Sequence, residues 1–269
     1  MGIHNYDLMY QTAKENVQKA AFSERNKELI IAFANDRLLE GISKSRAVRY
    51  LGALKLLATL VDKDLDKATK EDMKRLVGII HERSYTPWTK RCYKLILRQF
   101  YKWLAGTEQY PDIVSWIPIK ISKSEVSLPS EGDLLSEEDI QKLVQAAEHP
   151  RDKAFVSMLW ESGGRVGEVG NLRIRNLIFD SYGTVITVQG KTGSRKIRLI
   201  ASTPYLAAWL NTHPTKTGES PLWINIGTRN HNNAMAYITL RALLKRLFEK
   251  AGIKKRYNPH LFRHSRATF

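Results

Sequence analysis

The chain has 269 residues, 43% of them hydrophobic and 26% charged, which is enough for two ordinary globular cores. Its formal net charge is +16 and its pI is about 9.8. An excess of positive charge this large favours a polyanionic partner, and nucleic acid is the first candidate. The alternative is a charged surface that only keeps the protein in solution.

Several other classes of protein are excluded by composition. The single cysteine, Cys92, excludes an intrachain disulfide framework and fits a reducing compartment. No apolar run reaches the roughly 18 residues that a membrane span needs, so no membrane partner is expected. The seven histidines have no cysteine cluster beside them and no zinc-like spacing. We therefore expect neither a metal site nor a cofactor.

The first 106 residues read as a helical domain. Apolar residues recur at intervals of three and four, and Ser, Thr, Pro and Gly mark the starts and stops. The predicted helices are 5–22, 23–41, 43–61, 69–83 and 86–106. Residues 107–133 have no clean period and contain Pro111, Pro118 and Pro129, so they are predicted to be an extended linker.

Residues 134–269 are predicted to form a mixed domain. Segments 183–190 and 195–200 alternate like strands and are separated by a Gly-containing turn, which predicts a β-hairpin. The helices predicted around this hairpin are 135–149, 152–164, 202–213, 233–252 and 258–269. The predicted fold class is mainly α, with a small β-sheet or hairpin confined to the second domain.

Basic residues follow helical periodicity at two places in the first domain. Lys90, Lys94, Arg98 and Lys102 recur every four residues and predict one basic helix face, with Arg91 beside it. The residues Lys44, Arg46 and Arg49 crowd a helix start, where the dipole adds to their positive potential. A DNA phosphate backbone would explain both groups. A solvated helix face is the alternative reading for any single residue.

Three short motifs in the second domain carry possible chemistry. Arg165 follows two glycines, and Glu168 stands three residues later, which suits either an oriented phosphate-binding guanidinium or a structural Arg–Glu pair. Lys191 lies in the hairpin turn, where it is either a reaching catalytic group or an ordinary polar turn residue. Arg195 follows in the next strand and is a further candidate DNA contact.

The third motif is at the start of the last helix. Asn258 is a natural cap and Pro259 a natural first residue, so His260 and Arg263 share a face in the first turn. Both residues are then near free backbone N–H groups at the positive end of the helix dipole, which predicts a phosphate site.

Taken in order, Gly-Gly-Arg165-x-x-Glu168, then Gly190-Lys191, then His260-x-x-Arg263 resemble the tyrosine recombinase/phage integrase family, in particular its Xer-like and archaeal members. The resemblance extends over nearly the whole chain, and it implies a helical core-binding domain followed by a mixed α/β catalytic domain.

What the resemblance implies for function is site-specific DNA recombination or integration by metal-free phosphoryl transfer through a 3′-phosphotyrosyl intermediate. Arg165 and Arg263 would clamp the scissile phosphate, and Lys191 would act as general acid. His260 would assist and Glu168 would support the site. The partner would be double-stranded DNA, with a self-assembled tetramer on DNA in the full-length form. The location would be the cytoplasm or nucleoid of a prokaryote, or a virus or mobile element.

The main departure from the family concerns its nucleophile. The family's tyrosine follows the His-x-x-Arg motif by some tens of residues, whereas the last of the eleven tyrosines here is Tyr257. We therefore expect a C-terminally truncated form, with an incomplete catalytic domain, that binds DNA without cleaving it. A regulatory DNA-binding fragment and a topoisomerase-like strand-passing enzyme are the alternatives.

Overall fold

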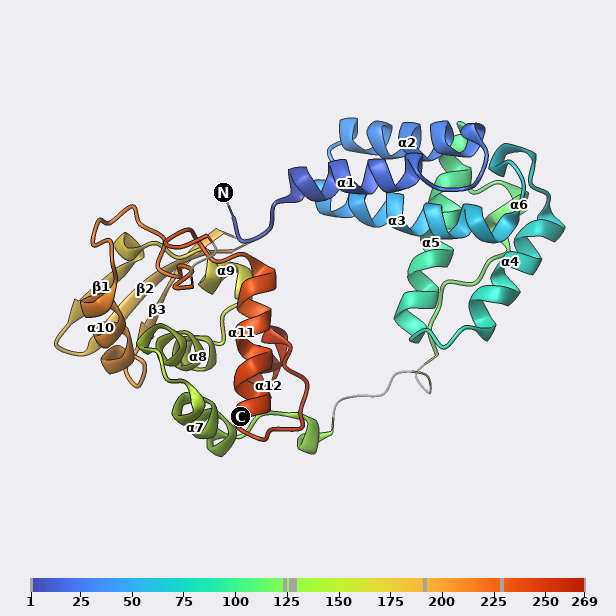
Figure 1. The fold of residues 1–269 in the computed structure, drawn as a ribbon. Coiled ribbons are helices and arrows are strands. Elements are labelled where there is room, and N and C mark those ends of the chain that lie inside the picture. The colour runs from blue at the N-terminus through green and yellow to red at the C-terminus, as the bar shows by residue number, and fades with distance from the viewer. Residues whose placement is uncertain (1, 123–124, 126–129, 191–192, 228–229, 269) are drawn as a thin grey trace. The chain divides into compact units, whose positions relative to one another are not determined.

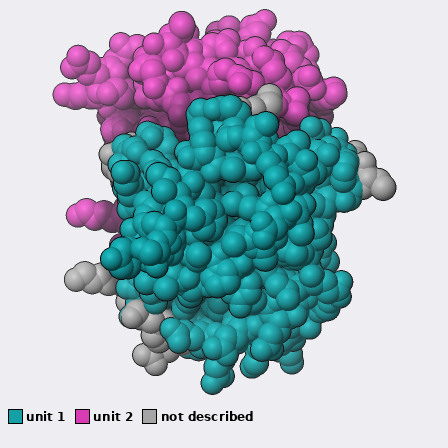
Figure 2. Space-filling model, turned by 90° about the vertical axis from the view of Figure 1, so that its left-hand side faces the viewer, with its two compact units in different colours: residues 1–4, 129–269 teal, residues 5–128 magenta. Residues whose placement is uncertain are grey.

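The fold is described from a computed structural model of the chain, covering residues 2–122, 125, 130–190, 193–227 and 230–268. It has two compact units (Figures 1 and 2). The helical unit is Asn5–Leu128, and the mixed unit combines Met1–His4 with Pro129–Phe269. Among the described residues, no helix is both long and apolar enough to span a membrane.

The helical unit has one core enclosed by amphipathic helices (Figure 1). Its helices are α1 (Tyr6–Gln18), α2 (Glu24–Leu39), α3 (Lys44–Val61), α4 (Lys70–Glu82), α5 (Pro87–Leu104) and α6 (Asp112–Ser115), with a 3₁₀ turn at Leu65–Lys67. Local sequence sets their starts: Ser23 and Thr86 accept hydrogen bonds from Asn26 and Thr89, and Thr69 forms a capping box with Asp72. Phe33 and Phe100 meet edge to face in the core.

The predicted linker differs from the structure at its beginning. Residues 112–115 form α6, and Val114 and Ile117 are buried in the core of the helical unit. The prolines on either side hid this short helix, because they broke the apolar period on which the prediction relied. The helical unit therefore extends beyond the predicted boundary at residue 106.

The mixed unit consists of a small antiparallel sheet and the helices packed with it (Figure 1). The strands β1 (Leu177–Asp180), β2 (Gly183–Gly190) and β3 (Gly193–Leu199) pair in the order β1-β2-β3. Its helices are α7 (Glu137–Ala146), α8 (Pro150–Ser162), α9 (Val166–Gly170), α10 (Thr203–Thr212), α11 (Tyr237–Lys250) and α12 (Pro259–Thr268), with 3₁₀ turns at Glu131–Asp133 and Ile174–Asn176.

The predicted fold class, mainly helical with a small sheet in the second domain, is confirmed. The hairpin is present, with Val188 opposite Arg195 and Gly190 opposite Gly193. Strand β1 was missed because only four residues form it. The turn signal Asp180-Ser181-Tyr182-Gly183 between two apolar runs could have revealed it.

The first residues of the chain join the mixed unit rather than the helical unit. Ile3 is buried in the core that contains Phe155, Trp223 and Leu240. The sequence prediction had assigned residues 1–106 to one domain, because four residues before a helix carry no periodicity of their own.

Candidate active site

Arg165 and Glu168 are held together at the start of α9. Arg165 is the residue before the helix, and its Nη1 donates to Glu168 Oε1 at 2.9 Å. The backbone N–H of Arg165 donates to Glu168 Oε2 at 3.0 Å. The carboxylate is buried, whereas the Arg165 side chain is 47% exposed. The Glu168 carboxylate therefore holds the backbone N–H and one guanidinium nitrogen of Arg165, while much of the arginine side chain remains accessible.

Arg195 is a second partner of the same carboxylate. Its Nη1 and Nη2 donate to Glu168 Oε1 and Oε2 at 3.1 and 2.7 Å, a two-point bond that joins β3 to α9. Bonds from Arg195 and then Arg165 lower the pKa of Glu168 to about 2, although burial opposes the shift. Glu168 is therefore ionised at neutral pH. It carries one negative charge between two arginines, so the cluster keeps a net positive charge.

Gly190 leaves the space in which Glu168 and Arg195 come together. A Cβ on Gly190 would lie 2.7 Å from Glu168 Oε1 and 3.3 Å from Arg195 Nη1. A side chain there would force the Glu168 carboxylate, and with it its bond to Arg195, to shift. Arg195, which the sequence predicts to contact DNA, is paired in the structure with Glu168 and keeps a side chain that is 39% exposed. No simple spacing signal would have revealed this pair, because 27 residues separate its members.

Arg263 is anchored beside the same motif. Its Nη1 donates at 2.7 Å to the carbonyl oxygen of Gly163, two residues before Arg165. Gly163 ends α8 with φ of 53°, a left-handed conformation that favours glycine and turns the chain toward α9. The bond joins residues 100 apart in sequence. The structure thus connects the two arginine motifs through the Gly163–Arg165 segment.

His260 lies one turn before Arg263 on α12 and is exposed. Its backbone N–H donates to Asn258 Oδ1 at 3.0 Å, which confirms the predicted capping role of Asn258, and Pro259 is the first helical residue. Because three residues separate His260 and Arg263, their side chains share a helix face. Farther along α12, Ser265 Oγ accepts from the N–H of Leu135 at 2.8 Å and so fastens the helix to the chain before α7.

Lys191, the predicted general acid, lies outside the described residues. Its neighbours Gly190 and Gly193 are paired across the hairpin. Within the described part of the chain, no group of three or more His, Cys, Asp or Glu residues is placed to hold a metal ion.

The predicted basic face of α5 is largely covered by the chain that follows it, so this prediction needs correction. Arg91 Nε donates to the carbonyl of Ile119 at 2.9 Å, and Arg98 Nη1 donates to that of Ile117 at 3.2 Å. The Arg98 guanidinium also lies 4.0 Å from the ring centre of Tyr110. The segment after α5 therefore occupies groups that the periodicity alone assigned to DNA.

Lys94 departs most from the prediction, because it is only 7% exposed. Burial lowers the pKa of its ammonium group, while nearby Glu125 opposes the shift. Lys90, one turn earlier, donates to the carbonyl of His81 at 2.7 Å. The four-residue spacing correctly predicted a shared face, but that face packs against the protein's own backbone and side chains.

The second basic group, at the start of α3, is more open. Arg46 and Arg49 are both exposed, and Lys44 forms an ion pair with Asp7. Ser43, which precedes the helix, makes no side-chain capping bond, and the first turn contains no acidic residue. This helix start is therefore the more accessible of the two predicted basic groups.

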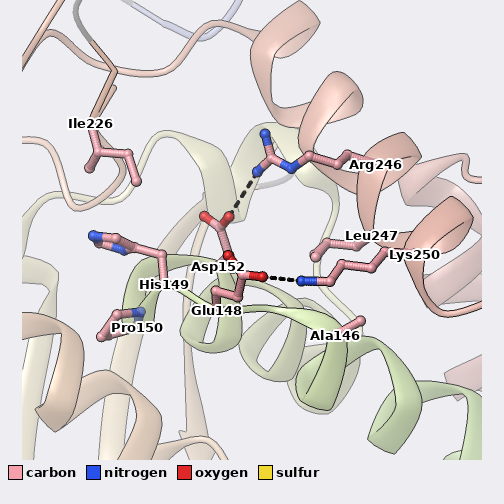
Figure 3. A pocket seen from close by; sticks show the side chains of 9 residues that line it. All are labelled: Ala146, Glu148, His149, Pro150, Asp152, Ile226, Arg246, Leu247 and Lys250. Carbon is pink, nitrogen blue, oxygen red and sulfur yellow. Dashed lines mark hydrogen bonds and ion pairs between the residues drawn. The ribbon is translucent and has the colours of Figure 1, made fainter.

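A pocket of about 600 Å³ lies elsewhere in the mixed unit, between the α7–α8 connection and α11 (Figure 3). Its charged groups are paired with one another: Arg246 with Asp152 at 3.0 Å, and Lys250 with Glu148. None of the predicted site residues that the structure describes lines it. The arginine cluster, rather than this pocket, is the candidate site.

Comparison with known proteins agrees with this cluster of motifs. The profile of the Phage integrase family matches residues 133–269, half of the chain. The chain belongs to this family. The resemblance noted from the sequence is confirmed, and it places the chain among proteins of site-specific DNA recombination.

Among relatives, the tyrosine recombinase XerA of Pyrococcus furiosus is 26% identical over 247 residues, which cover 90% of this chain and 79% of the relative. A tyrosine recombinase of Pseudothermotoga lettingae is 34% identical over 137 residues, covering 51% of this chain and 46% of that protein.

Two solved structures share the phage integrase fold with this chain at lower identity. Lambda integrase(75-356), a dimer bound to a COC′ core site, matches with a TM-score of 0.68 at 15% identity, covering 90% of this chain and 88% of that one. XerH recombinase bound to its palindromic difH substrate matches with a TM-score of 0.64 at 17% identity, covering 97% and 82%.

Proposed function

We propose that this chain binds duplex DNA and holds a scissile phosphate between Arg165 and Arg263, as part of a tyrosine recombinase. The observation that carries the proposal is the arginine cluster. Arg165 and Arg195 share the buried carboxylate of Glu168, and Arg263 is bonded to the backbone two residues before Arg165. Cations fixed in this way can stabilise charge on a phosphate without rearranging.

In the proposed reaction, a tyrosine oxygen attacks the phosphorus and forms a 3′-phosphotyrosyl bond, while the bond to the 5′-oxygen breaks. Arg165 and Arg263 donate to the non-bridging oxygens, where negative charge builds up. Lys191 gives a proton to the leaving 5′-oxygen. His260, on the face of α12 that also carries Arg263, donates to the phosphate. Glu168 orients the arginines and is not itself a reacting group.

The 269 residues contain no tyrosine after Tyr257, which precedes His260 and Arg263. We therefore propose that this chain by itself binds DNA and forms no covalent adduct. The net charge of +16 supports DNA as the partner, and so does the DNA in the structures of lambda integrase and XerH. A lambda integrase tetramer on a Holliday junction, with a TM-score of 0.65, supports self-assembly on DNA as part of the same proposal.

A library of nicked duplexes with a randomised centre tests both parts of the proposal. At low salt we expect the chain to retain duplex DNA and to enrich some sequences over others. We expect a denaturing gel to show no covalent protein–DNA band. Arg165→Ala should weaken retention about tenfold, whereas Arg173→Ala, which removes a surface arginine paired with Glu219, is the matched control.

Two outcomes would count against the proposal. A covalent band from these 269 residues would show that one of their own side chains acts as the nucleophile. Failure to retain any duplex at low salt would remove DNA as the partner.

A further inference from the structure

Trp88, in the first turn of α5, is the most exposed of the six tryptophans. It is 60% exposed, whereas the other five are buried or half-buried. The Arg91 guanidinium lies over the indole, 5.9 Å from the ring centre. Arg91 is itself held in place, because its Nε donates to the carbonyl of Ile119 at 2.9 Å. The indole is therefore supported by a fixed cation, while much of the residue stays open to solvent.

The side chains around Trp88 are basic. Arg83 Nη1 donates to the hydroxyl of Tyr85 at 3.0 Å, and Lys90 Nζ donates to a backbone carbonyl at 2.7 Å. Among the described side chains, no carboxylate pairs with either cation or with Arg91. The sequence itself contains no Asp or Glu from residue 83 to residue 107. This surface therefore keeps its positive charge. We call it the Trp88 corner, made of Arg83, Trp88, Lys90 and Arg91.

A second exposed aromatic ring shows what distinguishes the Trp88 corner. Tyr182, between β1 and β2, is 76% exposed, and the Arg198 guanidinium also lies 5.9 Å from its ring centre. Arg198, however, donates to both carboxylate oxygens of Asp180, at 2.7 and 2.9 Å. The positive charge beside Tyr182 is thus balanced. Of the two rings, only Trp88 has a charge beside it that is complementary to a polyanion.

Duplex DNA offers an indole few apolar partners. The faces of its bases are stacked on one another, and its outer surface consists of charged phosphates. The apolar groups displayed in the major groove are the C5-methyl groups of thymine. An α-helix is about 10–12 Å across, so it fits the major groove, which is about 12 Å wide, but not the minor groove of about 6 Å. A tryptophan on a helix is therefore suited to meet a thymine methyl group.

The beginning of α5 is open enough for such a contact. Ser84, Thr86 and Trp88 are all exposed, in contrast to the covered row that starts farther along the helix. The bond from Arg91 to Ile119 links the two regions, because the segment after α5 holds the guanidinium that supports the indole.

We propose that Trp88 reads DNA sequence by packing its indole against a thymine methyl group in the major groove, while Arg83 and Lys90 attract the flanking phosphates. Because this contact requires the chain to bind duplex DNA, it rests on the proposed function. Arg91 is a positioning residue in this arrangement: it supports the ring and does not itself reach a phosphate.

Replacing thymine by uracil tests the contact at the level of one methyl group. A duplex that the wild type enriches from a randomised pool is prepared with each thymine changed in turn to uracil, which keeps every hydrogen-bonding group of the base. For the wild type, uracil at one or two positions should weaken binding about fourfold. Trp88→Ala should bind the unmodified duplex about tenfold more weakly and should lose nothing further when uracil is present.

Three further variants separate the role of the indole from other effects. Tyr182→Ala is the matched control, since it removes an exposed ring with an arginine at the same distance, and it should change neither affinity nor the response to uracil. Trp88→Phe keeps an aromatic ring, so it should retain part of the uracil effect even if Trp88→Ala folds poorly. Arg91→Met should reduce the uracil effect and leave the salt slope of binding unchanged. A salt slope lowered by about one would instead make Arg91 a phosphate contact.

Several outcomes would overturn the role of Trp88 while leaving DNA binding intact. These are an enriched sequence without thymine, wild-type binding that ignores uracil at every position, and a uracil effect that persists in Trp88→Ala. An equal loss of affinity for all duplexes in Trp88→Ala would likewise show that the indole does not read sequence. Failure of the wild type to retain any duplex would overturn the proposed function and the role of Trp88 together.

Discussion

The arginine cluster of the mixed unit and the basic row of α5 are both predicted from the sequence to bind DNA phosphates, but their environments in the structure are opposite. Around Glu168, one buried carboxylate orients two arginines and leaves positive charge to spare. On α5, backbone carbonyls of the following segment satisfy Arg91 and Arg98, and Lys94 is buried. The spacing of cations tells which residues share a face. What their donors bond to decides whether that face is available to a ligand.

The largest expected effect comes from removing the carboxylate itself. Glu168→Ala should lower the free energy of unfolding around α9 and β3 by about 3 kcal/mol, since it leaves two guanidinium groups without their shared acceptor. Hydrogen exchange of residues 166–170 and 193–199 measures this loss. Glu138→Ala, at an exposed acidic position of α7, is the control. A loss below about 1 kcal/mol would mean that the cluster is no more tightly organised than ordinary surface pairs.

The dependence of stability on pH tests whether the arginine cluster holds Glu168 in its ionised form. The pKa of Glu168 falls from 4.5 to about 2 in the folded protein. Its stabilising contribution is therefore fully present above pH 4.5 and is lost as the pH falls through about 2. The unfolding free energies of wild type and Glu168→Gln should converge by about 2 kcal/mol across that range, after allowance for the partly exposed arginines. If the unfolding free energies of the two proteins ran parallel across this pH range, the two arginines would not be stabilising the ionised carboxylate of Glu168.

The smallest effect distinguishes the two basic regions of the helical unit. Arg98→Ala should cost about 1 kcal/mol of stability, because it removes the contact with Tyr110 and the bond to Ile117. Arg46→Ala should change stability by less than about 0.5 kcal/mol, yet lower the salt slope of DNA binding by about one. If Arg98→Ala lowered the salt slope of DNA binding and Arg46→Ala did not, the α5 face rather than the start of α3 would be the DNA-binding surface.

Sequence reasoning predicted the regular parts of the molecule because local rules determine them. The helix starts at Ser23, Thr86 and Asn258 followed from capping chemistry, and the hairpin followed from alternation and glycine. The order of the motifs also predicted that Arg165 and Arg263 belong to one site. Their connection through Gly163 then required the folded chain, because no local pattern predicts a bond across 100 residues.

The misses share one physical cause, which is contact between segments far apart in sequence. The segment after α5 carries no periodicity that shows where it packs, so the burial of Lys94 could not be predicted from the spacing of the row. Arg195 was placed on the hairpin correctly, but its pairing with Glu168 depends on the close approach that Gly190 allows. Residues 2–4 are too few to show any pattern, and their place in the mixed unit depends on Asn171 and Tyr237, which form hydrogen bonds with the backbone of Ile3.

The docking of Ile3 also has a consequence for synthesis on the ribosome. Its partner Asn171 is 168 residues later in the chain, so at ordinary rates of translation Ile3 waits roughly 10 to 30 s before that partner is made. The helical unit, complete at residue 128, can fold during this delay with an apolar isoleucine exposed beside its first helix. Ile3 is thus synthesised well before the residue that binds its backbone, and an apolar side chain of the mixed unit stays without its native neighbours while the helical unit can already fold.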